Sequence, residues 1–327
     1  MKVGVVGGGR IAATSHLPVL AANPRCEIDL VEPDIERRSS LERLFRLRRS
    51  VGSLDEAETW NWDAILVMVP HEQMFEVALD CLKFKLPILL EKPPGMTLNE
   101  TKELHHRAIG LGVRVMVGFQ RRFNPILKTG LEQLREHTRI RSLTIEQRLP
   151  SIRLLQAGGV PESELVNILP TQFIHHIDYV RFLMGKPAEI SAFVGGSRAM
   201  PDLYAAQMVF EDGSTAQIHY SLLSADRSFR MSIIGEETAL VEKSANNGRE
   251  VLFEFGGEVK VLSIRVPQGQ PYRPFLDGFV AQDNHFLDCV ADQRDWEMPA
   301  SNLGDAIATM ELLELIGHRQ LGGLSKW

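Results

Sequence analysis

The sequence is short of several features that would place it in a special class of protein. Only three of its 327 residues are cysteines, and Cys26, Cys81 and Cys289 lie far apart without C-x-x-C spacing. Such sparse cysteines exclude a disulfide framework and a cysteine-based zinc site, and they indicate free thiols in a reducing compartment. We therefore expect no structural disulfide and no metal site.

Long hydrophobic runs and an excess of positive charge are also lacking. No apolar stretch reaches the roughly 18–20 residues that span a bilayer, and the first apolar run soon meets glycines. We therefore expect a cytoplasmic protein with no membrane partner. The formal net charge of −6 argues against nucleic acid as a partner. The densest basic stretch, residues 46–49, is interpreted as the solvated face of a helix.

The first thirteen residues contain a strand, a glycine-rich turn and the start of a helix. Residues 3–6 are mostly β-branched and apolar, as is typical of a strand that is buried on both faces. Gly7, Gly9 and Ala12 follow with G-x-G-x-x-G/A spacing. The first glycine permits the tight turn, and the second lets the backbone approach a pyrophosphate. The third small residue lets the helix pack closely, with its N-terminal N–H groups directed at the phosphates. This context predicts a dinucleotide site.

An acidic residue supports the same prediction. Glu32 lies twenty positions after Ala12, at the end of the next apolar run. There its carboxylate can accept hydrogen bonds from the adenosine ribose hydroxyls. The same charge, with Asp34 nearby, would repel the 2′-phosphate of NADP. NAD is therefore the expected cofactor and NADP the less favoured one, with Arg37 and Arg38 placed on the following helix.

The two parts of the chain differ in pattern. Residues 1–118 alternate short apolar strands with longer amphipathic helices, which predicts a parallel sheet covered on both faces. Beyond residue 185, alternating runs are separated by turns, which predicts an antiparallel meander. We place a domain boundary at Gly118, giving domains at 1–118 and 119–327. Helical patterns cover residues 125–135, 171–184 and 302–321, whereas no structure is assigned to residues 148–167.

The order of the motifs resembles the Gfo/Idh/MocA oxidoreductases, which include glucose-fructose oxidoreductase and inositol dehydrogenase. The resemblance covers nearly the whole chain and is densest up to about residue 130. It is carried by Val3–Ala12, Val69-Pro70-His71, Glu91-Lys92-Pro93, Val117–Pro125 and His175-His176-Ile177-Asp178.

The resemblance implies an α/β protein with an N-terminal Rossmann domain and a C-terminal α+β domain. The second domain would bind the substrate. Its open, mainly antiparallel sheet would pack against another subunit, giving a homodimer or homotetramer. The resemblance also implies hydride transfer between a nicotinamide and a hydroxyl or carbonyl carbon of a sugar derivative, cyclitol or nucleotide sugar. The expected cofactor contacts are Gly7, Gly9, Arg10, Ile11, Glu32, Pro70, His71 and Glu91.

Lys92 matches the catalytic lysine of the family's Glu-Lys-Pro signature. At the carboxyl end of a parallel strand its ammonium can hydrogen-bond the reacting oxygen and stabilise the charge that develops there. Glu91 is expected either to bond the cofactor or to orient Lys92. The resemblance also implies a cis peptide bond before Pro93. His16, by contrast, is interpreted as a structural histidine.

His175 matches the histidine of the family's His-x-x-Asp motif. It would act as general base in alcohol oxidation and as general acid in the reverse direction, which suits its near-neutral pKa. Asp178 shares its helix face and can hold the imidazole in one tautomer. The neighbouring His176 is the alternative assignment, and a satisfied interior histidine is the alternative role.

Two further positions bear on the substrate. Thr171 stands where inositol-type relatives carry an aspartate, so this chain departs from an inositol-type site. Arg121 lies where relatives line the substrate pocket, and it either anchors an anionic or polyhydroxylated substrate or forms a structural ion pair. With Asp178, these two residues are the candidate substrate contacts.

The leading hypothesis is an NAD-dependent oxidoreductase in which Lys92 polarises the reacting oxygen and His175 moves its proton. Two alternatives remain. One is a non-catalytic dinucleotide-binding sensor or scaffold on the same fold. The other is a sugar hydrolase or lyase that acts through transient oxidation by a retained NAD. Substrate identity and reaction direction stay open.

Overall fold

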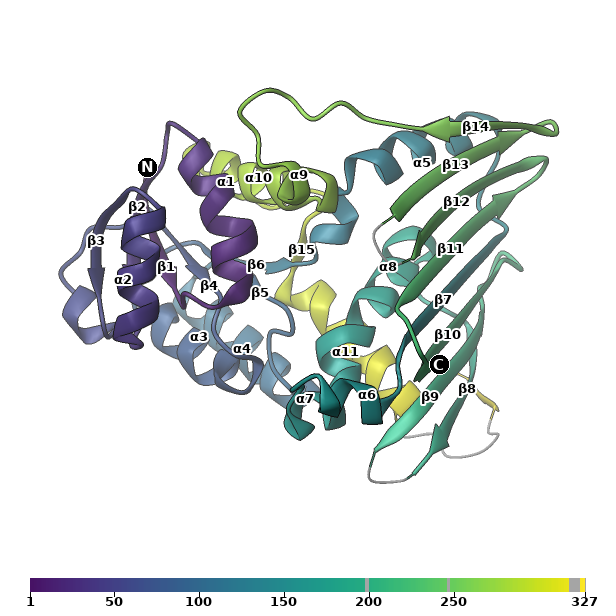
Figure 1. Ribbon diagram of the computed structural model, residues 1–327, viewed down its shortest axis with the longest axis horizontal. Coiled ribbons are helices and arrows are strands. Elements are labelled where there is room, and N and C mark those ends of the chain that lie inside the picture. Colours follow the sequence, from purple (N-terminus) through teal and green to yellow (C-terminus); the bar gives the residue numbers. More distant parts are fainter. Residues whose placement is uncertain (198–199, 246–247, 318–323, 327) are drawn as a thin grey trace. The chain divides into compact units, whose positions relative to one another are not determined.

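The computed structural model describes residues 1–197, 200–245, 248–317 and 324–326 (Figure 1). The chain divides into two compact units. The first holds Met1–Pro125 and Arg265–Met310, and the second holds Ile126–Ile264 and Glu311–Trp327. The chain thus returns to its first unit, whereas the sequence-based division places all of 119–327 in one domain.

The first unit is built on a seven-stranded sheet with the order β15-β6-β5-β4-β1-β2-β3. All neighbouring strands are parallel except for β15, which runs antiparallel to β6. This order is that of a Rossmann fold and confirms the predicted α/β class. The strands are β1 (Lys2–Val6), β2 (Glu27–Val31), β3 (Leu47–Val51), β4 (Ala64–Val67), β5 (Ile88–Glu91), β6 (Val115–Gly118) and β15 (Ser301–Asn302).

Helices cover this sheet because its strands are apolar on both faces. The side chains of β4, for example, are entirely buried. A capping box begins α4, where Thr97 and Glu100 exchange hydrogen bonds between side chain and backbone. The larger helices of this unit are α1 (Leu17–Ala22), α2 (Ile35–Leu44), α3 (Met74–Leu82), α4 (Leu98–Leu111), α9 (Tyr272–Asp277) and α10 (Phe279–Ala291).

The interpretation of residues 46–49 as a helix face was wrong, because most of this stretch lies in the edge strand β3. The reason is Asp29 on β2, whose side chain is fully buried. Arg48 Nε donates to its carboxylate at 2.9 Å, and Arg49 Nη2 donates at 3.2 Å. A buried carboxylate without such partners costs several kcal/mol, so the two arginines are held beside β2.

Several contacts hold residues 265–310 in the first unit. Strand β15 pairs with β6, with Ser301 opposite Val117. Arg122 Nη2 donates to Asp305 at 2.6 Å. Gly278 has a positive φ of 96°, and a Cβ there would lie 2.2 Å from the carbonyl oxygen of Gln120, so the two segments are in backbone contact. Helix α10 also packs against α1 (Figure 1).

The second unit is built on a nine-stranded sheet with the order β14-β13-β12-β11-β7-β10-β9-β8-β16. Only β7 and β10 pair in parallel, which confirms a mainly antiparallel sheet among the described strands. The strands are β7 (Ser142–Pro150), β8 (Glu189–Gly196), β9 (Pro201–Val209), β10 (Thr215–Ser224), β11 (Ser228–Gly235), β12 (Thr238–Ala245), β13 (Gly248–Phe255), β14 (Glu258–Leu262) and β16 (Leu324–Lys326).

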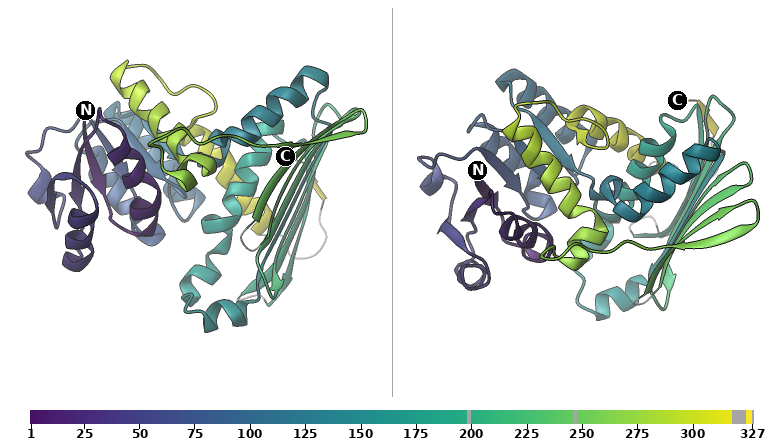
Figure 2. Two further views of the ribbon diagram at one scale, coloured as in Figure 1. Left: turned by 45° about the horizontal axis from the view of Figure 1, so that its top comes forward. Right: turned by 90° about the horizontal axis from the view of Figure 1, so that it is seen from above.

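One face of this sheet packs against α5 (Pro125–His137) and α8 (Ile174–Met184), and no helix of the described chain covers the other face (Figures 1 and 2). The unassigned segment contains two short helices, α6 (Ile152–Ala157) and α7 (Glu162–Val166). The expected C-terminal helix is α11 (Leu303–Gly317), and residues 318–321 lie outside the described chain. Exposed apolar side chains on the open face are Phe193, Leu223, Ile234, Val259 and Val261.

The close fit of Gly4 against Trp62 gives a test of packing in the first unit. A Cβ at Gly4 would lie 2.6–2.7 Å from three atoms of the Trp62 ring. This ring is 5% exposed and donates to Asp29 at 2.9 Å. Gly4→Ala is therefore expected to lower the free energy of unfolding by about 1–3 kcal/mol. In Gly110→Ala on α4 the new methyl group meets no atom within 4 Å, so this control should gain about 0.5–1 kcal/mol. Equal effects of the two changes in urea unfolding would contradict this packing.

Candidate active site

The glycine-rich turn has the geometry that a dinucleotide requires. Gly7 has a φ of 96°, and a Cβ there would lie 2.6 Å from the carbonyl oxygen of Met68, so the position needs glycine. At Gly9 a Cβ would meet no atom within 4 Å, so its backbone borders open space. The helix begins at Arg10, directly after this space. The turn therefore leaves room for a pyrophosphate at a helix N-terminus.

The Glu32 carboxylate is fixed beside this turn. Its side chain follows β2 and is 3% exposed. Oε2 accepts a hydrogen bond from the Gly8 amide at 2.6 Å. Oε1 accepts from the Asp34 amide at 2.9 Å and from Arg37 Nη1 at 3.2 Å. Because a carboxylate has about four acceptor positions, Glu32 can also accept from a ribose hydroxyl. These residues therefore fit the adenosine part of a dinucleotide.

Lys92 follows the last residue of β5 and is partly buried. Burial is the largest cause that lowers the pKa of Lys92 to about 8, opposed by Glu91 and reinforced by Arg121 and Arg10. The peptide bond between Lys92 and Pro93 is cis, as the resemblance implied. A lysine with such a pKa can donate to a reacting oxygen as an ammonium and can also exchange a proton near neutral pH.

His71 presents a second polar group at the same edge of the sheet. It lies in the short turn His71–Gln73, directly after the exposed Pro70 at the end of the β4 segment. Burial and then the charge of Lys92 lower the pKa of His71 to about 4, so its ring is neutral at physiological pH. Its Nδ1 is buried and has no hydrogen-bond partner in the described chain. Buried polar atoms are rarely left unpaired, so this nitrogen suits a bound ligand.

A buried cluster of charged groups lies behind Lys92. The side chain of His16 is fully buried. Its Nε2 is 3.1 Å from Glu91 Oε1, and its Nδ1 is 2.9 Å from Asp283 Oδ2. Sequence reasoning missed Asp283, although a signal was present: it lies four residues after Phe279 and three before Phe286, on the apolar face of α10. The cluster shows that His16 is buried and held between two carboxylates, one of which is Glu91.

The candidates of the second unit lie on α8 and on the π-helical turn before it, Leu169–Phe173. Thr171, His175 and Asp178 are all buried, at 4%, 8% and 1% exposure. The Thr171 hydroxyl donates to the carbonyl oxygen of Asn167 at 2.7 Å. The ring of His176 packs within 6 Å of other aromatic rings. These rings belong to Phe173, Tyr220 and Phe229.

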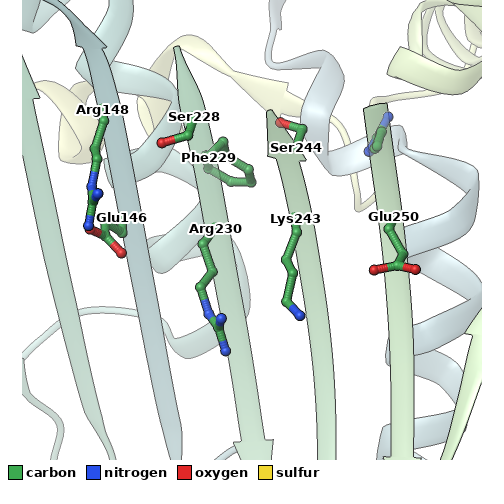
Figure 3. Close-up of a pocket in the computed structure, with 9 residues that line it drawn as sticks. Glu146, Arg148, Ser228, Phe229, Arg230, Lys243, Ser244 and Glu250 are labelled. Atoms are coloured by element: carbon green, nitrogen blue, oxygen red, sulfur yellow. The ribbon is translucent and has the colours of Figure 1, made fainter. Parts of the chain in front are cut away.

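A separate pocket of about 470 Å³ opens on the second unit, over β7, β11, β12 and β13 (Figure 3). Arg230 lies directly opposite Lys243 in the pairing of β11 with β12, and the two cations stand side by side in Figure 3. On β7, Arg148 Nη2 donates to Glu146 at 2.6 Å. None of the site residues expected from the sequence lines this pocket, so we do not assign the chemistry to it.

No group of three or more His, Cys, Asp or Glu side chains within the described ranges could hold a metal ion. None of the helices in this part of the chain combines the length and the apolar character needed to cross a bilayer. The three cysteines are free thiols, with Cys81 and Cys289 buried and Cys26 partly buried.

A parallel sheet with a glycine turn, a fixed acid after β2 and a lysine after β5 defines a dinucleotide-binding oxidoreductase. The family model described as oxidoreductase family, NAD-binding Rossmann fold, matches residues 1–119. The model of the GFO/IDH/MocA C-terminal domain matches residues 163–241. The chain belongs to the Gfo/Idh/MocA family of oxidoreductases.

Individual relatives are distant. Rhizopine catabolism protein MocA of Rhizobium meliloti is 25% identical over an alignment of 235 positions that covers 66% of this chain and 70% of the relative. The scyllo-inositol 2-dehydrogenase (NAD(+)) of Bacillus subtilis (strain 168) is 21% identical over an alignment of 330 positions, gaps included, that covers 95% of this chain and 92% of the relative. An oxidoreductase from Agrobacterium radiobacter, solved in complex with NAD+, L-tartaric acid and magnesium, has a TM-score of 0.80 at 14% identity. The match covers 100% of this chain and 98% of that chain. This likeness shows the fold.

The His16 cluster predicts a pH dependence of stability. Burial alone would lower the pKa of His16, but Asp283 and Glu91 together raise it to about 10 from an ordinary value of 6.5. The stabilisation that His16 contributes is therefore fully present below pH 6.5 and is lost as the pH rises through about 10. The wild-type protein and His16→Gln should differ less in free energy of unfolding as the pH rises from 6.5 to about 10. The difference should fall by at most about 1.4 kcal/mol per pH unit. Urea unfolding at several pH values measures it, with the exposed His106→Gln as control. A difference that stays constant would contradict the cluster.

Proposed function

We propose that this oxidoreductase is an NAD-dependent dehydrogenase or reductase acting on a hydroxyl or carbonyl carbon of a small polar substrate. A sugar derivative, a cyclitol or a nucleotide sugar is the proposed substrate class. The observation that carries the proposal is the position of Lys92. It directly follows β5 in the unit that holds the glycine turn, it is partly buried, and its pKa is lowered. The relatives named as an inositol dehydrogenase and a rhizopine catabolism protein support the substrate class.

The residues of the first unit would hold the cofactor, whose nicotinamide supplies the hydride acceptor or donor when bound. The backbone of Gly7 and Gly9 and the start of the helix at Arg10 and Ile11 would cradle the pyrophosphate. Glu32 would accept hydrogen bonds from the adenosine ribose. His71, whose Nδ1 is buried and unpaired in the described chain, would bond the nicotinamide half. Pro70 would contact the same half of the cofactor.

Lys92 and His175 would have different roles in the reaction. The Lys92 ammonium donates to the reacting oxygen and stabilises the negative charge that develops on it. His175 takes the hydroxyl proton in oxidation and returns it in reduction. The packing of His176 among aromatic rings supports His175 rather than its neighbour for this role. Asp178 would fix the tautomer of His175, and Thr171 and Arg121 would contact the substrate.

NAD is proposed in preference to NADP. Glu32 is nearly inaccessible to solvent and receives hydrogen bonds from two backbone amides and Arg37. A carboxylate held so firmly cannot move aside for a 2′-phosphate, and its charge repels one. The relative whose name specifies NAD(+) supports the same choice.

Lys92→Ala gives the direct test of the catalytic assignment. The change removes the donor to the reacting oxygen, and we expect kcat to fall by about 10²–10³-fold. The Kd of the variant for NADH should stay within about twofold of the wild-type value, because the glycine turn and Glu32 are untouched. In a separate test of Glu32, the wild-type protein should bind NADPH at least about tenfold more weakly than NADH. Steady-state kinetics and NADH fluorescence titration measure both. Retained turnover in the variant would show that Lys92 is not catalytic.

We also propose that the protein is cytoplasmic and self-associates through the open face of its nine-stranded sheet. Five large apolar side chains on that face are 43–62% exposed. Large apolar side chains left exposed on an uncovered sheet face favour association, and the family resemblance implies a second copy of the chain as the occupant. Free thiols at all three cysteines fit a reducing compartment.

Two charged substitutions test this association. Phe193→Glu and Val261→Glu place a carboxylate on the open face and should convert the dimer or tetramer into monomer. Leu154→Glu is the control, because Leu154 is 40% exposed but lies on α6 and not on the sheet. Light scattering after gel filtration gives the mass of each protein. A wild-type protein that is monomeric at micromolar concentration would refute the association.

A further inference from the structure

The side chain of Glu91 occupies the space that a side chain at position 118 would fill. In the pairing of β5 with β6, Glu91 lies opposite Gly118. A Cβ at Gly118 would lie 2.7 Å from Glu91 Oε1, so the missing side chain lets the carboxylate lie across the neighbouring strand. There Glu91 is 5% exposed and 3.1 Å from His16 Nε2. The residue directly before Lys92 is therefore anchored by its side chain.

His16 is held in turn from its other side. Its Nδ1 lies 3.1 Å and 2.9 Å from the two carboxylate oxygens of Asp283, and its ring meets Phe279 edge-on at 5.1 Å. A neutral imidazole can donate from one nitrogen only, whereas the protonated ring donates from both. Two carboxylates on opposite sides of one ring thus select the protonated form, in agreement with the raised pKa of His16.

The helix that carries His16 is also irregular. Residues Ala12–His16 form a π-helical turn, although the chain on both sides is α-helical. Such turns are rare and occur frequently at functional sites. Burying three ionisable groups is likewise a poor way to stabilise a fold, because apolar residues of similar size usually do as well or better. Both features fit a role of the cluster in function as well as in stability.

We propose that His16 and Asp283 are positioning residues for Lys92. Asp283 holds the His16 ring, the ring holds the Glu91 carboxylate, and the anchored Glu91 fixes the strand end from which Lys92 extends. This inference rests on the proposed catalytic role of Lys92. Asp283 lies on α10, in the segment 265–310 that returns to the first unit. The inference therefore gives this helix a role in positioning the catalytic lysine.

Asp283→Asn tests the proposal, with Asp29→Asn as a matched control. Both aspartates are fully buried, both belong to the first unit, and both accept from charged side chains. Asp29, however, pairs with Arg48, Arg49 and Trp62. We expect Asp283→Asn to lower kcat at least about tenfold, with the KM for NAD and the affinity for NADH within about twofold. Asp29→Asn should leave kcat within about twofold even where it destabilises the protein equally.

A second measurement does not depend on turnover. In protein labelled with ¹³C at lysine Cε, the Lys92 resonance is assigned by its absence from Lys92→Ala. It should titrate near pH 8 in the wild-type protein and in Asp29→Asn. In Asp283→Asn its midpoint should rise toward the ordinary lysine value, because a loosened side chain loses its burial. The charged or titratable groups that act on Lys92 include Arg10, His71, Glu91 and Arg121.

The two measurements separate the possible failures. If Asp283→Asn matches Asp29→Asn in both kcat and Lys92 titration, the positioning role is refuted. If the wild-type protein turns over no substrate, the proposed function fails, and the lysine titration alone decides the positioning role. If Asp283→Asn does not fold, His16→Gln replaces it in the same comparison. Its single amide group cannot bridge both carboxylates, so the same losses are expected.

Discussion

The parallel register of β1, β2, β4 and β5 is the constraint on which the candidate site depends. Parallel strands end at the same edge of a sheet, and ligands bind at that edge. The register therefore delivers Gly7, Glu32, His71 and Lys92 to one side of the first unit, although they are far apart in the sequence. Each group follows its strand by only a few residues, so its position is set by the sheet rather than by a long loop.

The polar groups at this edge are supported by hydrogen bonds that act before any ligand binds. Glu32 is fixed by the amide of Gly8, and Glu91 is fixed by His16. Preorganised groups of this kind need little rearrangement when charge develops during a reaction. The second unit supplies buried candidates of its own on α8, where His176 packs in a cluster of aromatic rings.

Local signals in the sequence predicted the parallel sheet of the first unit and the glycine turn, and they placed Glu32 and Lys92 at strand ends, because each signal depends on residues a few positions apart. Signals that depend on distant residues failed. Residues 46–49 were misread because nothing nearby shows that Asp29 on β2 needs two arginines. Asp283 was missed because its partner His16 lies 267 positions away. The return of residues 265–310 to the first unit has the same cause, since pairing of β15 with β6 leaves no local pattern.

The measurement that tests the central claim most directly is the absorbance of NADH when the protein is mixed with NAD and a panel of sugars, sugar acids, cyclitols and nucleotide sugars. The account predicts that NADH accumulates with at least one hydroxyl-bearing substrate, or is consumed with the matching carbonyl compound. Tight NADH binding with no change of absorbance in either direction would contradict a dehydrogenase and favour a sensor. Cleavage of a sugar by protein that retains NAD, without net NADH, would show transient oxidation instead.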